Sequence, residues 1–160
     1  MYPTHVCANG NISHSRAWGG PEVPRILIVD DEGAIRTLLS LAFTQSGYDV
    51  QTAADGPEAI NLCRAQRFDV VLSDVTMPGM NGHDLARWIA EHCPATQTVL
   101  MSGYDLECQN CPAAPRCELL PKPFKPMEAV ATVGQVLGAS RGARQAAAPV
   151  PNPRPPMRAG

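Results

Sequence analysis

The stretch that most constrains the fold runs from Phe68 to Gly82 and reads Phe-Asp-Val-Val-Leu-Ser-Asp-Val-Thr-Met-Pro-Gly-Met-Asn-Gly. Within it, an apolar run leads to Asp74 and passes directly into a loop that is rich in Pro and Gly. Such a run predicts a parallel strand that is buried on both faces and delivers an acid to its end. Because open α/β sheets bind ligands outside the carboxyl ends of their strands, the sequence predicts a functional carboxylate at Asp74.

Two other strand-like runs end in polar residues of complementary types. One leads into Asp30 and Asp31, and the other leads into Ser102. Helical periods lie between the apolar runs, and parallel neighbours need such crossovers, so we expect a doubly wound parallel α/β sheet. The polar strand ends should then meet around Asp74. The expected strands are 25–29, 48–53, 68–73, 97–101 and 118–120, and the last expected helix begins near Pro126 and buries Met127, Val130, Ala131 and Leu137.

Both ends of the chain differ from the middle in composition. Residues 1–24 show no apolar period, and residues 139–160 are rich in Ala, Arg and Pro. We therefore expect both ends to be disordered and the folded domain to cover residues 25–138. The net charge of −2 combines an Arg-containing tail with an acidic middle. An acidic domain gives no electrostatic footprint for direct binding of nucleic acid.

The sequence shows no segment that would place the chain in or across a membrane. No apolar run approaches the roughly 18 residues that a membrane span needs. No basic segment followed by an apolar stretch marks a signal peptide at the N-terminus. We therefore expect a cytoplasmic protein whose six cysteines are thiols and no disulfide framework.

Three acids at one edge of a sheet repel one another unless a cation joins them. The carboxylates of Asp30, Asp31 and Asp74 offer oxygen ligands only, which suits Mg²⁺ and leaves coordination positions open for a phosphoryl oxygen. Ser102 would supply a hydroxyl donor and Lys122 a positive charge. Asp74 is then expected to be the nucleophile that forms an acyl phosphate. Each residue alone would also suit a turn, a cap or a solvated side chain, but their occurrence at successive strand ends favours a site.

Four separate motifs carry a resemblance to a known family. They are Ile28-Val29-Asp30-Asp31-Glu32, the stretch from Ser73 to Gly82, Leu100-Met101-Ser102-Gly103-Tyr104 and Pro121-Lys122-Pro123-Phe124. Through them the chain resembles the receiver domain of two-component response regulators over about residues 25–138. The resemblance implies a flavodoxin-like fold with five parallel strands in the order 2-1-3-4-5. It also implies a signalling protein that is not an enzyme and that loses its phosphoryl group slowly.

The resemblance assigns roles to single residues of the expected metal site. Asp74 resembles the phosphoacceptor, and Asp31 resembles the direct Mg²⁺ ligand. Asp30 would act on the metal through water, and the backbone carbonyl of Thr76 would complete the protein ligands.

Further roles follow for the residues that would contact the phosphoryl group. Ser102 resembles the switch hydroxyl that moves onto this group, and Lys122 resembles the lysine that is usually followed by a cis proline, here Pro123. The chain departs from the family pattern at Leu119, where the family often has an aromatic residue that turns inward on activation.

Cysteines gather in the stretch between the fourth and fifth expected strands, where two prolines allow only a short helix, if any. Cys108 and Cys111 form a Cys-x-x-Cys pair, Cys117 follows them and Cys93 lies upstream. Three or four thiolates suit Zn²⁺ or an iron–sulfur cluster, and a Cys-x-x-Cys pair also suits a reversible disulfide. Inert thiols are the third interpretation. We therefore expect the fourth crossover to be irregular and leave its chemistry open.

The sequence thus favours a stand-alone, single-domain response regulator. It would accept a phosphoryl group from a histidine kinase or a phosphotransfer protein onto Asp74 with Mg²⁺. Phosphorylation would then switch a protein–protein output surface for an output protein that the sequence does not identify. The alternative is a redox- or metal-sensing module that resembles a receiver and acts through Cys108, Cys111 and Cys117.

Overall fold

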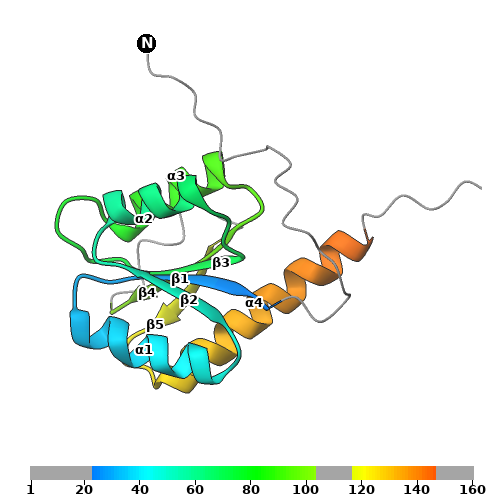
Figure 1. Cartoon of the computed structure of the whole chain (residues 1–160), viewed down its shortest axis with the longest axis horizontal. Coiled ribbons are helices and arrows are strands. Elements are labelled where there is room, and N and C mark those ends of the chain that lie inside the picture. Colours follow the sequence, from blue (N-terminus) through cyan, green and yellow to red (C-terminus); the bar gives the residue numbers. More distant parts are fainter. Residues whose placement is uncertain (1–22, 104–116, 147–160) are drawn as a thin grey trace, which may run out of the picture.

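The structure is a computed structural model that describes residues 23–103 and 117–146, with side chains up to residue 142. Strands and helices alternate along this part of the chain (Figure 1). The strands are β1 (Arg25–Val29), β2 (Asp49–Ala53), β3 (Val70–Asp74), β4 (Gln97–Ser102) and β5 (Cys117–Pro121). The helices are α1 (Gly33–Gln45), α2 (Gly56–Ala65), α3 (Gly82–His92) and α4 (Pro126–Ala146).

The strands form one parallel sheet in the order β2-β1-β3-β4-β5. This order confirms the predicted doubly wound, flavodoxin-like fold. Because all strands point the same way, the carboxyl ends of β1, β3 and β4 share one edge of the sheet. The crossover between β4 and β5 lies outside the described residues, so its irregular character stays a prediction.

Helices cover both faces of the sheet, with α2 and α3 on one face and α1 and α4 on the other (Figure 1). The side chains of β1 alternate between the two resulting cores. Ile26 and Ile28 pack on the side of α1 and α4, whereas Leu27 and Val29 pack on the side of α2 and α3. All four are fully buried, which explains why this strand is continuously apolar in sequence.

Local sequence fixes the starts of the two helices that follow β2 and β3. Asp55 caps α2 by accepting a hydrogen bond from the Glu58 amide at 2.8 Å. The Glu58 carboxylate in turn accepts from the Ala54 amide at 2.7 Å, a reciprocal arrangement that satisfies two amides at the helix start. Asn81 caps α3 by accepting from the Asp84 amide at 2.9 Å.

The last helix differs from its prediction in two respects. It continues to Ala146, past residue 138, where the sequence placed the end of the folded domain. Its buried face consists of Ala129, Val133 and Leu137, whereas Met127 is 61% exposed. Ala131 is exposed as well, so the predicted burial of both residues is wrong. Ala and Gly fill much of this helix, and no strongly polar face marked its orientation in the sequence.

None of the helices described here is both long and apolar enough to span a membrane.

Candidate functional site

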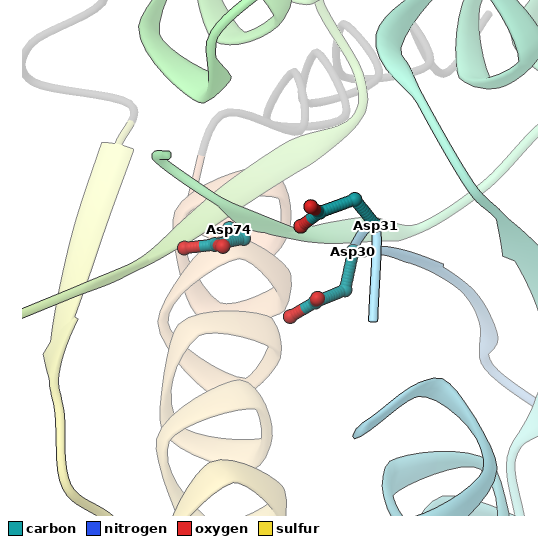
Figure 2. A group of neighbouring side chains, drawn as sticks. All are labelled: Asp30, Asp31 and Asp74. Atoms are coloured by element: carbon teal, nitrogen blue, oxygen red, sulfur yellow. The ribbon is translucent and has the colours of Figure 1, made fainter. Parts of the chain in front are cut away.

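Three carboxylates meet at the edge of the sheet formed by the carboxyl ends of β1 and β3. Asp30 and Asp31 follow β1, and Asp74 is the last residue of β3. Carboxylate oxygens from the three residues lie within 4.8 Å of one another. Figure 2 shows that the side chains of Asp30 and Asp31 both extend towards the side on which Asp74 lies. The structure therefore brings together the acids that the sequence predicted to meet.

Asp74 is buried and receives its polar contacts on one oxygen. The Lys122 Nζ atom lies 3.2 Å from Asp74 Oδ1. The Thr76 amide donates to the same oxygen at 3.3 Å. The second oxygen, Oδ2, has no hydrogen bond or ion pair to any described residue. One oxygen is therefore held in place while the other is available to react.

Of the three acids, Asp30 lies in the surroundings that least favour an ionised carboxylate. Its side chain is fully buried. Its Oδ1 accepts from the Glu32 amide at 2.9 Å, but Oδ2 has no hydrogen-bond partner among the described residues. Burial raises the pKa of Asp30 above its usual value; the Glu32 amide opposes this shift, and the charge of Asp74 adds to it. A buried carboxylate oxygen without a partner is costly unless a cation or water fills the space beside it.

Asp30, Asp31 and Asp74 form an acid pocket whose chemistry fits a hard divalent cation. All its donors are carboxylate oxygens, and Asp31 is exposed enough to leave room for water around a bound ion. Mg²⁺ favours such oxygen ligands and keeps several waters. The orphaned oxygen of Asp30 gives an independent reason for a cation at this place. Thr76 lies beside Asp74, but a role for its carbonyl stays a prediction.

Ser102 and Lys122 lie at the same edge of the sheet. In the pairing of β3 with β4, Asp74 is the partner of Met101, so Ser102 follows directly beyond it. The Lys122 amide donates to the Ser102 carbonyl at 2.7 Å, which joins the ends of the two segments. The peptide between Lys122 and Pro123 is cis, as the resemblance implied. The structure thus brings Asp30, Asp31 and Lys122 close to Asp74 and places Ser102 at the same edge of the sheet.

Sequence reasoning missed two residues that shape this site. Gly82 begins α3, and a Cβ added there would lie 2.3 Å from the carbonyl oxygen of Asp74. In the sequence, Gly82 stood out only as the last residue of the motif that begins at Ser73. Arg36 donates from Nη1 to the carbonyl oxygen of Asp30 at 2.6 Å. Nothing in the sequence separates Arg36 from a solvated side chain on the first turn of a helix.

The predicted cysteine site is only partly within the described residues. Cys108 and Cys111 lie outside them, so their role stays a prediction. Cys117 is a half-buried thiol at the start of β5. Cys93 is disulfide-bonded in the structure, so the prediction that all six cysteines are thiols is wrong at this residue. A disulfide-bonded Cys93 does not present the thiolate that a metal ligand requires.

Comparison with known proteins gives matches over most of the described domain. The family described as response regulator receiver domain matches residues 26–134. Sensor kinase CckA of Brucella abortus is 36% identical over 116 residues, which are 70% of this chain and 12% of that protein. Alkaline phosphatase synthesis transcriptional regulatory protein PhoP of Bacillus subtilis is 32% identical over 115 residues, which are 71% of this chain and 48% of PhoP. The chain therefore spans less than half the length of these curated relatives.

Solved structures share the fold over almost their full length. Chemotaxis response regulator CheY4 of Vibrio cholerae has a TM-score of 0.66 at 30% identity, covering 72% of this chain and 99% of CheY4. Response regulator TrrA of Thermotoga maritima, in complex with Mg²⁺ and BeF, has a TM-score of 0.65 at 30% identity, covering 71% of this chain and 99% of TrrA.

Proposed function

The chain belongs to the response regulator receiver domain family, and from this premise we propose that Asp74 accepts a phosphoryl group from the phosphohistidine of a histidine kinase or a phosphotransfer protein. Phosphorylation of an Asp and use of Mg²⁺ are general features of the family. The observation that carries the proposal is the set of groups around Asp74: carboxylate oxygens of Asp30 and Asp31 lie within 4.8 Å, and the Lys122 amine lies 3.2 Å away.

The geometry supports a direct transfer to the carboxylate. Asp74 Oδ2 attacks the phosphorus atom, the new O–P bond forms, and the P–N bond to the donor's imidazole breaks. The departing imidazole nitrogen takes up a proton from solvent. Lys122 and the Thr76 amide hold Oδ1, so that Oδ2 faces the donor. The Lys122 amine also offsets negative charge on the transferring oxygens.

Mg²⁺ would be held by Asp30, Asp31, Asp74 and the carbonyl of Thr76. Bound there, it would supply positive charge opposite the phosphoryl oxygens. The Ser102 hydroxyl would donate to the phosphoryl group after transfer and so couple phosphorylation to the end of β4. Leu119 on β5 lacks the hydroxyl and the ring that the family often places there.

A surface beside the site suits the approach of the phosphodonor protein. Leu38 and Leu41 on α1 are 50% and 57% exposed. Exposed large apolar side chains on one helix are typical of partner contacts. The helix α1 begins only two residues after Asp31, so a partner seated on it would bring its histidine to the acid pocket. We propose this helix as the docking surface of the kinase or phosphotransfer protein.

Other predictions from the sequence are not part of the support for this proposal. Three statements stay predictions: that the protein is stand-alone and acts through a protein–protein output surface, that its ends are disordered outside a receiver unit that begins at residue 25, and that it is cytoplasmic. Zn²⁺ or an iron–sulfur cluster at the cysteines also stays a prediction, which metal analysis of the purified full chain would test. No observation favours the cysteine-based sensor as the main function.

The direct test is the intact mass of the full chain after incubation with acetyl phosphate and Mg²⁺. We expect one added phosphoryl group on the wild type and none on Asp74→Asn. Asp49→Asn is the matched control, because Asp49 begins β2 at the opposite edge of the sheet and pairs there with Arg25 at 2.9 Å. It should be phosphorylated like the wild type. Equal phosphorylation of Asp74→Asn would contradict the proposal.

A further inference from the structure

Arg36 makes a contact that links the first turn of α1 to the acid pocket. Its side chain is half-buried. The Nη1 atom donates to the carbonyl oxygen of Asp30 at 2.6 Å. A hydrogen bond from an ionised donor is shorter and stronger than one between neutral groups. The contact therefore fixes the backbone at the point where β1 ends.

The carbonyl that Arg36 contacts belongs to the peptide that joins Asp30 to Asp31. Asp30 has other contacts: its amide donates to the Ala53 carbonyl at 3.2 Å, and its carboxylate accepts from the Glu32 amide at 2.9 Å. The carboxylate of Asp31, in contrast, has no hydrogen bond or ion pair within the part of the chain that the structure describes. Its position therefore depends on the backbone that carries it.

We propose that Arg36 is a positioning residue of the Mg²⁺ site: it fixes the peptide between Asp30 and Asp31, and so aims the otherwise unsupported carboxylate of Asp31 at the metal. This inference rests on the proposed function, in which Asp31 is a direct metal ligand. Ligands that are held before the ion arrives bind it more tightly, because less ordering is needed on binding.

The direction in which Mg²⁺ affinity changes when Arg36 is removed distinguishes a positioning role from a purely electrostatic one. Arg36 is a cation near a cation site, so if it acted only through its charge, its removal would strengthen Mg²⁺ binding. If it acts by positioning Asp31, its removal weakens binding although a repulsive charge is lost. A purely structural role would lower the melting temperature and leave the Mg²⁺ dissociation constant unchanged.

The experiment is a calorimetric titration of the full chain with MgCl₂, with the melting temperature of each variant measured in parallel. Arg36→Met keeps the volume and removes both charge and donors. We expect its Kd for Mg²⁺ to rise at least about fivefold, because one hydrogen bond from a charged group is lost. Arg36→Lys keeps a charged donor on a flexible stem and should give an intermediate Kd. Arg87→Met is the control and should bind like the wild type, since among the described residues Arg87 forms only an exposed pair with Asp84 at 3.4 Å.

Each outcome decides the matter. A Kd for Arg36→Met equal to or below that of the wild type overturns the positioning role while the proposed function stands. If Arg36→Met does not fold, Arg36→Lys carries the test, and a wild-type Kd for Arg36→Lys overturns the proposal. A wild type that binds no Mg²⁺ overturns the proposed function, and the role of Arg36 falls with it.

Discussion

At the scale of single residues, the site holds negatively charged carboxylates that have few hydrogen-bond partners among the described residues. Asp30 is fully buried, one of its oxygens has no partner among the described residues, and burial together with the charge of Asp74 raises its pKa. The same features that make Asp30 unfavourable in the metal-free protein suit it to attract a cation. Stability and function thus oppose each other at this residue.

Asp30→Asn should stabilise the metal-free protein by about 1 kcal/mol, because a buried charge is replaced by a neutral amide. Because the folded-state pKa of Asp30 lies above its usual value, the metal-free wild type should lose stability as pH rises through that pKa, and the variant should not. Thermal unfolding in EDTA at several pH values measures both effects. The variant should also gain little stability from added Mg²⁺. A lower melting temperature for Asp30→Asn in EDTA would contradict this view of the site.

Cys63 and Cys117 give a second residue-scale prediction. Burial raises the pKa of the Cys63 thiol to about 11, and only thiolates react readily with alkylating agents. Cys117 is half-buried and serves as the internal comparison. In native protein at pH 8, iodoacetamide should label Cys117 before Cys63, as read from peptide masses over time. Equal labelling rates would show that Cys63 is not held in the core between α2 and the sheet.

At the scale of elements, the start of α3 is tied to the phosphoacceptor strand. The Gly82 amide donates to the Val75 carbonyl at 2.9 Å. There is no space for a side chain at Gly82, because an added Cβ would lie 2.3 Å from the carbonyl oxygen of Asp74. Helix α3 therefore lies closer to the backbone of β3 than any residue with a side chain at position 82 would allow.

Two Gly→Ala variants test this close approach against ordinary helix propensity. Gly82→Ala should destabilise the protein by about 1–3 kcal/mol, because backbone must shift to admit the methyl group. Gly138→Ala should instead stabilise it by about 0.5–1 kcal/mol, because Gly138 lies inside α4 with nothing within 4 Å of its added Cβ. Urea unfolding of both variants gives the comparison. The same sign for both variants would refute the close packing at α3.

The sequence predicted elements well where the hydrophobic period was clear and poorly where it was not. The continuous apolar run of β1 identified this strand directly. The helix α4 was found, but its face was not, since its small residues fit several orientations and Met127 proved exposed. The contact of Arg36 with Asp30 could not be foreseen, because it depends on a side-chain conformation and not on a spacing.

At the scale of the whole molecule, one sheet separates two cores and belongs to both. Leu72 faces the core under α1 and α4, and its neighbour Val71 faces the core under α2 and α3. Neither core has strands of its own. Loss of either helical layer would expose strands that the other layer needs, so the two layers should unfold together.

Cooperativity of the two layers can be measured through Trp88. Its ring stacks on His92 and lies 5.6 Å from the Arg64 guanidinium, so it reports on the α2 and α3 layer. In a Trp18→Phe background, urea unfolding followed by Trp88 fluorescence and by far-ultraviolet circular dichroism should give the same midpoint. Separate midpoints would show that the layers unfold independently.

The most direct test of the central claim is to identify the residue that carries the phosphoryl group. The full chain is phosphorylated with acetyl phosphate and Mg²⁺ and then treated with borohydride. Hydride reduces the acyl phosphate to an alcohol with release of phosphate, which converts the modified Asp to homoserine. We expect peptide masses to place homoserine at position 74 and at no other acid of the pocket. Homoserine at Asp30 or Asp31, or a phosphoryl group that borohydride does not remove, would contradict the account.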